Sequence, residues 1–145
     1  MILMPEPSVF SKIISGVIPS HRVYEDDHVY AFLDIGPLAP GHTLVVPKEP
    51  AVTLGELSDD ASAALGRALP RICRAVCEAT GSTQYNLLQN NGERAGQVVM
   101  HVHFHIIPRP ASGGGLEVGW TPGALDQSVG AALAEEIASH LGAGG

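Results

Sequence analysis

The chain of 145 residues has few charges and little positive charge. It contains only eight Lys and Arg against fifteen Asp and Glu, which gives a formal net charge of −7, and charged residues make up 16% of it. Proteins that bind a nucleic-acid backbone need a cluster of basic side chains, so this composition argues against nucleic acid as a partner. It does not exclude a small anionic ligand, because backbone N–H groups can bind a phosphate.

The sequence also lacks long apolar runs and has only two cysteines. No run reaches the roughly 20 residues of a transmembrane helix, and Pro5 interrupts the first residues before a signal-peptide core could form. Cys73 and Cys77 lie four positions apart, which is neither a metal-ligand spacing nor a redox CxxC. We therefore expect a cytoplasmic protein that does not bind membranes and whose cysteines are buried thiols.

Apolar periodicity and turn residues predict an α+β fold with an antiparallel sheet. Ser58 is a favourable N-cap, and the acidic residues after it suit the first turn of a long helix that ends before Gly81. The length fits a single domain, 1–145, with a core at about 8–122. Helices are expected at 9–18, 59–80 and 126–141, and strands at 22–25, 28–33, 42–46, 84–90 and 101–107.

The segment MHVHFHIIPR, residues 100–109, carries three of the seven histidines at alternate positions. In a strand, the three imidazoles would share one face and the apolar residues between them the other. Two kinds of chemistry suit this pattern: a zinc site, or phosphoryl transfer with one imidazole as the nucleophile. The preceding loop, NNGERAGQVV, offers backbone N–H groups that suit a tetrahedral anion, and no Cys, Asp or Glu nearby completes a metal shell. These observations favour phosphoryl transfer.

The motif HVHFHII resembles the His-x-His-x-His-x-x signature of the histidine-triad nucleotide-binding family. Two further blocks, IISGVIPSHRVYEDDHVYAFLDIGPLAPGHTLVVPK and NLLQNNGERAGQ, resemble that family in the same order and at similar distances. The likeness covers about residues 8 to 122. It implies a histidine-triad fold, a five-stranded antiparallel sheet with one long helix, to which this chain adds a C-terminal helix. It also implies a homodimer whose sheets join edge to edge, which agrees with the sparse surface charge.

The resemblance also implies a role for particular residues. His103 would be the nucleophile that attacks the α-phosphorus of a nucleotide and forms a nucleotidyl-histidine, which water then hydrolyses. His101 and His105 would contact phosphate oxygens and orient the nucleophile, and His42 would be the family's fourth histidine. The remaining matches are Asn90, Gly96, Gln97 and Val98 on the phosphate side, Asp34 for the ribose hydroxyls, and Phe10, Ile13, Ile18, Phe32 and Ile35 around the base.

The sequence departs from the family pattern in two places. Many bacterial relatives bind a structural zinc through two cysteines and a histidine where this chain has Ser8, Ser11 and Pro50, so that only His101 remains as a ligand. We therefore expect neither a metal nor any other cofactor. The second departure is Val98, which stands where many members carry a Ser or Thr hydroxyl near the leaving group.

The sequence therefore predicts a nucleotide hydrolase or transferase with a purine nucleotide as its substrate. It would release a nucleoside monophosphate, AMP or GMP, from a phosphoramidate or a dinucleoside polyphosphate. Two alternatives belong to other classes: a nucleotide-binding regulatory module with negligible turnover, and a metal-dependent hydrolase.

Overall fold

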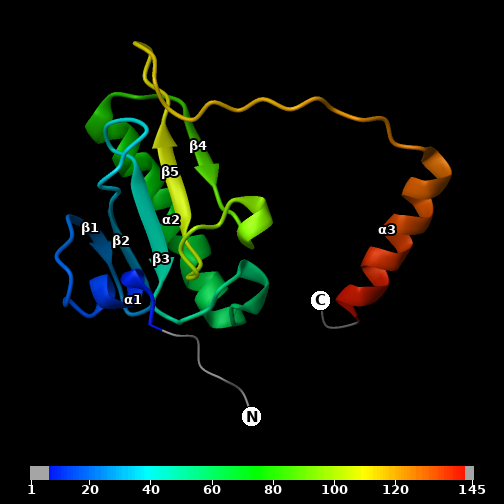
Figure 1. The fold of residues 1–145 in the computed structure, drawn as a ribbon, viewed down its shortest axis with the longest axis horizontal. Coiled ribbons are helices and arrows are strands. Elements are labelled where there is room, and N and C mark those ends of the chain that lie inside the picture. Colours follow the sequence, from blue (N-terminus) through cyan, green and yellow to red (C-terminus); the bar gives the residue numbers. More distant parts are fainter. Residues whose placement is uncertain (1–6, 143–145) are drawn as a thin grey trace.

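The computed structural model describes residues 7–142 and contains a five-stranded antiparallel sheet with the strand order β1-β2-β3-β5-β4 (Figure 1). The predicted α+β class, the sheet, the long helix and the C-terminal helix are all confirmed. The strands are β1 (Arg22–Glu25), β2 (Val29–Leu33), β3 (Thr43–Pro47), β4 (Tyr85–Leu88) and β5 (Phe104–Pro108). The helices are α1 (Val9–Ile14), α2 (Asp59–Thr80) and α3 (Gln127–Leu141), with short 3-10 turns η1 (Leu54–Glu56) and η2 (Glu93–Ala95).

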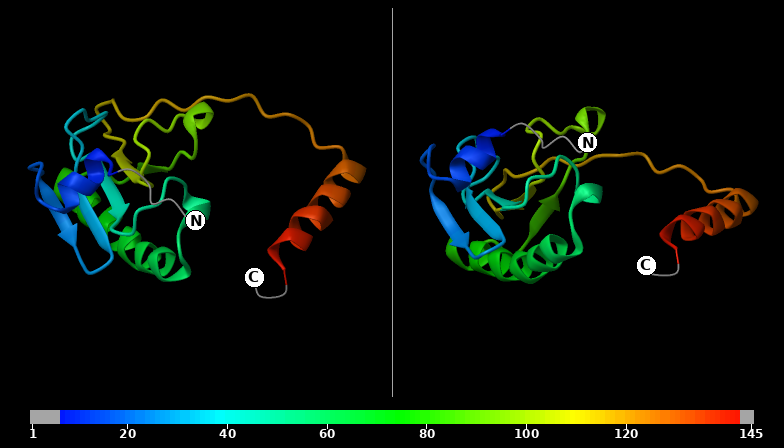
Figure 2. Two further views of the ribbon diagram at one scale, coloured as in Figure 1. Left: turned by 60° about the horizontal axis from the view of Figure 1, so that its bottom comes forward. Right: turned by 90° about the horizontal axis from the view of Figure 1, so that it is seen from below.

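Helix α2 covers one face of the sheet (Figure 2). Its ends are those expected from the sequence: the Ser58 hydroxyl accepts a hydrogen bond from the Ala61 N–H, and Gly81 closes the helix with a φ of 71°. Small residues such as Ala64 and Ala68 face the sheet and let the helix lie close to it. The buried core between them contains Val29, Ala31, Val45, Ala64, Leu65, Ala68, Ile72, Cys73, Val76 and Ile106.

The opposite face of the sheet is only partly covered, by the short helix α1. Phe10 of α1 packs edge-on against Phe32 of β2, with the ring centroids 5.6 Å apart. Side chains alternate along a strand, so β2 and β3 send every second residue into each of two cores. Because α1 has only six residues, it leaves part of this face open.

Strand β5 is shorter at its start than the sequence predicts. Alternation predicted a strand over 101–107, but pairing begins at Phe104, so His101 and His103 precede the strand. The continuation of the ladder would meet Pro47, which has no N–H to donate, and the Pro47 carbonyl is hydrogen-bonded by the His101 ring. The Val102 N–H instead donates to the Ala51 carbonyl.

Although the strand begins later than predicted, the histidines and the apolar residues between them still lie on opposite faces of the sheet. Phe104 and Ile106 pack toward the core under α2. Phe10 of α1, on the opposite face, contacts the rings of both His101 and His103. The histidines therefore face the open side of the sheet.

Two further expectations concern the cysteines and the membrane. Cys73 and Cys77 are free thiols on α2, the first buried as expected and the second only half-buried. Within residues 7–142, no helix combines the length and the apolar character that crossing a bilayer requires.

Beyond the sheet, the chain continues as an extended strap, residues 117–125, that leads to α3. This helix stands apart from the body on the side of β4 (Figures 1 and 2).

Candidate active site

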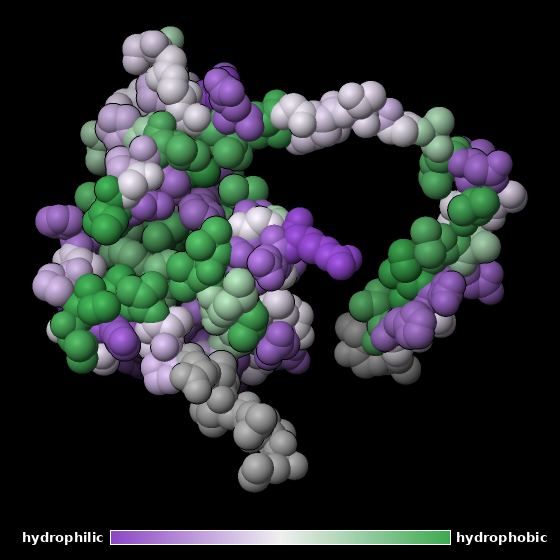
Figure 3. Space-filling model, viewed as in Figure 1, coloured by the Kyte–Doolittle hydropathy of each residue, from purple (hydrophilic) through white to green (hydrophobic). Residues whose placement is uncertain are grey.

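A cavity of about 480 Å³ opens beside the histidines, between α1, the sheet and the loop after η2. In Figure 3 the surface is hollowed over this region, and apolar residues surround the hollow. One end of the cavity is polar and includes His103, His105, Asn90 and Asp34. The apolar part includes Phe10, Ile13, Ile18, Phe32, Leu44 and Val99.

His103 lies at the polar end with its ring held in one orientation. Its Nδ1 lies 2.7 Å from the carbonyl oxygen of His101, and a carbonyl can only accept, so Nδ1 carries a proton and donates it. The unprotonated Nε2 of the neutral ring then has a free lone pair. Phe10 packs edge-on against the same ring at 5.0 Å between centroids. The side chain is 8% exposed and lines the cavity.

His101 does not line the cavity, and both of its ring nitrogens are engaged. Nε2 donates to the Pro47 carbonyl at 2.9 Å. Nδ1 is therefore the acceptor, and the Ser8 hydroxyl donates to it at 3.0 Å. In this geometry, therefore, neither ring nitrogen of His101 is free for the phosphate contact expected from the sequence. Its backbone carbonyl instead orients the ring of His103.

His42 and His105 form a relay that ends in the cavity. The Leu38 N–H donates to Nδ1 of His42 at 3.1 Å, so the proton of the neutral ring lies on Nε2. That Nε2–H donates to Nδ1 of His105 at 2.9 Å. The remaining nitrogen of His105, Nε2, must then carry a proton, which makes it a hydrogen-bond donor beside His103. Asp34 lies beside the same ring nitrogen of His42, with 3.5 Å between its Oδ2 and the His42 Nε2.

Burial keeps these rings neutral. It is the main cause that lowers the pKa of His42, against a smaller opposite effect of the Asp34 carboxylate. Burial and then the neighbouring His103 and His42 lower the pKa of His105 to about 4. Burial also lowers the pKa of His101, although its hydrogen bond to Pro47 acts in the opposite direction. At neutral pH the tautomers described above for His42, His101 and His105 are therefore the relevant forms.

A metal site is the alternative use of the group formed by Asp34, His42 and His105. Each of these residues offers a ligand atom within 4.8 Å of the others. A metal bound through Nε2 of His42 would need a lone pair there, and the ring proton would have to move to Nδ1. Nδ1 faces the Leu38 N–H, which is itself a donor. The backbone therefore favours the hydrogen-bonded relay over metal binding.

The loop that follows η2 is closed by its own hydrogen bonds. Gly96 has a φ of +97°, and a Cβ there would lie 3.2 Å from Nδ2 of Asn90, so the position requires glycine. The N–H groups of Gly96 and Gln97 donate to the carbonyls of Glu93 and Gly92. The buried Gln97 amide bonds the backbone of Gly92, Val52 and Val99.

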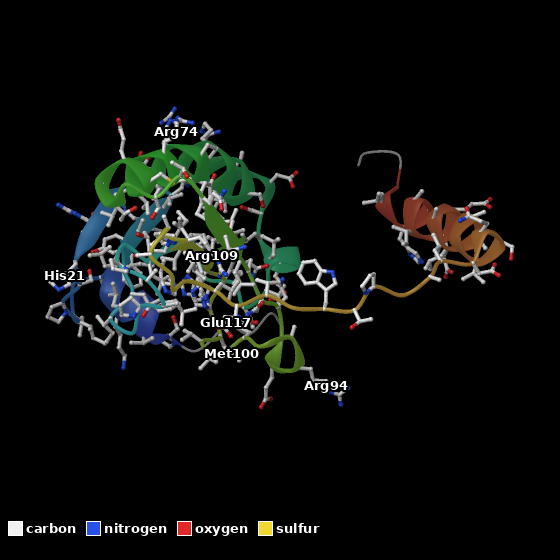
Figure 4. All side chains as sticks on the ribbon, turned by 90° about the horizontal axis from the view of Figure 1, so that it is seen from above. His21, Arg74, Arg94, Met100, Arg109 and Glu117 are labelled. Carbon is white, nitrogen blue, oxygen red and sulfur yellow. The ribbon has the colours of Figure 1, made fainter. Side chains whose placement is uncertain are left out.

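This internal bonding changes the predicted phosphate contacts. Gly96 and Gln97 shape the turn, but their amides are already used. Within residues 7–142, the Val98 N–H has no hydrogen-bond acceptor, and its 87% exposed side chain lines the cavity. Val98 therefore offers an open N–H group beside the cavity. Figure 4 shows Arg94, from η2, projecting away into solvent, so it adds no charge to the site.

The remaining predicted residues also come together at the cavity. Asp34 lines it and is half-buried, and its Oδ1 accepts from the Gly36 N–H at 2.8 Å. All five residues predicted around the base line it, although Ile35 is 94% exposed. Sequence reasoning missed Leu44, Leu88 and Val99. Leu44 could have been found from alternation, since it follows His42 at a spacing of two on β3.

Comparison with known proteins gives the class of protein. Residues 15–112 match the model of the HIT domain. The protein Hit of Bacillus subtilis is 43% identical over 140 residues, covering 92% of this chain and 97% of its own length. The chain therefore belongs to the HIT family.

Relatives with named activities and a solved structure are similar over most of the chain. An adenosine 5'-monophosphoramidase of Schizosaccharomyces pombe is 46% identical, covering 92% of this chain and 97% of its own. An adenylylsulfatase of Arabidopsis thaliana is 48% identical over 101 residues, which are 70% of this chain and 51% of its own. The crystal structure of a HIT family member from Bacillus subtilis superposes with a TM-score of 0.90 at 41% identity, over 95% of this chain and 99% of that one.

Proposed function

We propose that this protein is a nucleotide hydrolase or transferase that cleaves at the α-phosphate of a substituted purine nucleotide. The substrate would be a nucleoside phosphoramidate or a related adenylate, or a dinucleoside polyphosphate, and one product a nucleoside monophosphate. The observation that carries the proposal is the free Nε2 lone pair of His103 beside a nucleoside-sized cavity. The activities named for the Schizosaccharomyces pombe and Arabidopsis thaliana relatives support a substituted adenosine 5'-phosphate.

In the proposed reaction, Nε2 of His103 attacks the α-phosphorus as the bond to the leaving group breaks. The proton stays on Nδ1, and its hydrogen bond to the His101 carbonyl oxygen stabilises the positive charge that develops on the ring. Water then attacks the same phosphorus, the P–N bond breaks, and the ring is regenerated. The Nε2–H of His105 and the Val98 N–H would donate to phosphate oxygens, where negative charge increases in the transition state.

The nucleoside would occupy the rest of the cavity. The Asp34 carboxylate would accept both ribose hydroxyls, with Asn90 near the phosphate. Phe10, Ile13, Ile18, Phe32 and Ile35 would surround the base. We further propose a homodimer in which the sheets join edge to edge, because β4 ends the sheet as an edge strand and exposes Tyr85 and Leu87.

The activity is tested by replacing the nucleophile. His103→Ala should lower kcat/KM for AMP release by more than the about 10²–10⁴-fold that general acid–base help supplies, because the covalent step itself is lost. AMP binding should persist, since the base and ribose contacts lie elsewhere. His28→Ala, an exposed histidine, is the matched control. Near-normal turnover by His103→Ala would refute the mechanism, and absence of turnover by the unaltered protein on phosphoramidates, adenylates and diadenosine polyphosphates would support the regulatory alternative.

The metal-dependent alternative is tested by elemental analysis. We expect no stoichiometric zinc and unchanged activity and Tm in EDTA. The Ser8 hydroxyl, at a position where a zinc site would need a ligand, donates a hydrogen bond to Nδ1 of His101. Hydroxyls bind zinc poorly. About one zinc per chain, with activity lost on chelation, would favour the metalloenzyme.

A further inference from the structure

The apolar end of the cavity contains one polar side chain that the proposed reaction does not use. Apart from the four polar residues at the histidine end, Ser20 is the only residue with a polar side chain among those that line the cavity within residues 7–142. It is half-buried and follows Ile18 and Pro19, which also line the cavity. Ligand pockets are mostly apolar, and the few polar groups in them fix the orientation of the ligand. Ser20 is therefore placed where a single hydroxyl can orient a base.

Ser20 is held by the phenol of Tyr30 on β2. The two hydroxyl oxygens lie 2.7 Å apart, so one hydroxyl donates to the other. Tyr30 is only 7% exposed, and its ring centroid lies 5.8 Å from that of Phe32. It shares a buried apolar cluster with Phe10, Phe32 and Leu44, which line the cavity. The packed phenol therefore fixes the position of the Ser20 side chain.

The direction of this hydrogen bond decides what Ser20 offers to a ligand. In the described part of the chain, neither hydroxyl has another hydrogen-bond partner. If Ser20 donated, the hydroxyl hydrogen of Tyr30 would be left without an acceptor at a buried position that does not line the cavity, and an unpaired buried donor costs free energy. A phenol is also more acidic than an aliphatic alcohol and hence the stronger donor. Tyr30 therefore donates, which leaves the Ser20 O–H free to donate into the cavity.

A free O–H donor at this end of the cavity suits an acceptor on the edge of a purine. The edges that lie away from the sugar carry unprotonated ring nitrogens, N7 in both purines and N1 in adenine. Such a nitrogen only accepts, so it matches a donor and not an apolar wall. Side chains such as Phe10 and Phe32 can pack against the faces of the ring, but they do not distinguish one edge from another. The Ser20 hydroxyl can.

We propose that Ser20, oriented by Tyr30, donates a hydrogen bond to a ring nitrogen of the purine and is thereby a specificity-determining residue of the site. The inference rests on the proposed binding of a nucleotide in this cavity. The base does not change during the reaction, so this hydrogen bond stabilises the bound substrate and the transition state equally. Its loss should therefore raise KM and leave kcat unchanged.

Calorimetric titration with AMP tests the hydrogen bond without requiring turnover. Ser20→Ala should weaken AMP binding about fivefold to tenfold, the value of one hydrogen bond. The analogues 1-deaza-AMP and 7-deaza-AMP each replace one ring nitrogen with a C–H group. The analogue that lacks the acceptor should bind the unaltered protein less tightly by a similar factor, and Ser20→Ala should not weaken its binding further. Ser62→Ala, at an exposed position of α2, is the matched control and should leave all the affinities unchanged.

A second variant tests the role of the phenol. Tyr30→Phe keeps the packed ring and removes its hydroxyl, so Ser20 keeps its O–H but loses the partner that orients it. AMP affinity should fall about twofold to threefold, less than in Ser20→Ala. Tyr24→Phe is the control, because it removes a phenol that donates to Asp26 outside the cavity. With adenosine 5'-phosphoramidate as substrate, Ser20→Ala and Tyr30→Phe should raise KM and leave kcat unchanged.

The outcomes separate base recognition from a purely structural contact. If the hydrogen bond between Ser20 and Tyr30 only tied the segment after α1 to the sheet, Ser20→Ala would weaken the binding of AMP and of both deaza analogues by the same factor, or of none of them. Either result would refute the inference, and the proposed function would stand, because AMP would still bind. An unaltered protein that does not bind AMP would refute the proposed function and this inference with it.

Discussion

Three of the four histidines of the site have their protonated nitrogen decided by a backbone group. The Pro47 carbonyl fixes the His101 ring, the His101 carbonyl fixes His103, and the Leu38 N–H fixes His42. None of these partners depends on a side chain, so a motif written in residue types does not contain them. The chemistry of each ring follows from where the loops place these groups.

The side chain of Ser8 also takes part, which leads to a prediction for this residue. Its hydroxyl accepts from the Ser11 N–H as the cap of α1 and donates to Nδ1 of His101. Ser8→Ala should lower kcat/KM by about fivefold to tenfold, the value of one hydrogen bond to a buried group, by loosening His101 and hence the carbonyl that orients His103. Ser8→Thr should restore activity. Ser11→Ala, which keeps the backbone cap, is the control.

Nitrogen chemical shifts of His101 can tell whether Ser8 positions the His101 ring or only caps α1. Ser8→Asp keeps the acceptor for the cap but cannot donate to His101, so a carboxylate beside Nδ1 should raise the pKa of that ring. Nitrogen chemical shifts of the His101 imidazole measure this directly. If Ser8→Asp left them unchanged, Ser8 would act only as the cap of α1.

At the scale of elements, the loop from η2 to β5 does most to shape the phosphate end of the site. Its turn is closed internally, whereas the Val98 N–H has no acceptor among residues 7–142 and the Val98 side chain stands open at the cavity. A hydroxyl at this position could help to protonate an amine leaving group, whereas a nucleotide leaving group is already a stable anion. We therefore propose that valine biases the protein toward acidic leaving groups.

Val98→Ser tests this bias. It should raise kcat/KM for a phosphoramidate by about fivefold, corresponding to roughly 1 kcal/mol for one hydrogen bond, and should change diadenosine polyphosphate hydrolysis less. Val98→Ala removes the same bulk without adding a hydroxyl and serves as the control. Equal gains for both substrates would mean that the hydroxyl holds a phosphate oxygen and that Val98 does not select the leaving group.

The elements also show what the sequence could predict. The caps of α2, the turn before β2 and the alternation in β2 and β3 are local signals, and they placed these elements within one or two residues. The start of β5 was misplaced because Pro47, distant in sequence, interrupts the ladder opposite it. The hydrogen bonds of Gln97 and His101 could not be predicted for the same reason, since their partners Val52 and Pro47 lie some 45 to 54 positions away.

For the whole molecule, three histidine rings at the site link stability to pH. The pKa values of His42, His101 and His105 are all lowered, chiefly by burial. A lowered pKa means that the unfolded chain binds protons at a higher pH than the folded protein does. As the pH falls below the ordinary histidine value of about 6.5, the unfolded state is therefore favoured. The carboxylates with lowered pKa values, such as Glu25 and Glu49, add to this effect only below about pH 4.5.

The free energy of unfolding should thus decrease from pH 7 to pH 5, by up to about 1.4 kcal/mol per pH unit for each proton that unfolding takes up. Urea denaturation at the two pH values measures it. His105→Asn removes the ring whose pKa is lowered to about 4. It should therefore lower the number of protons taken up on unfolding by about one. His28→Asn, at an exposed position, should leave the dependence unchanged. Stability that is equal or greater at pH 5 would show that the rings are already protonated in the folded protein, and the tautomers assigned to the relay would then be wrong.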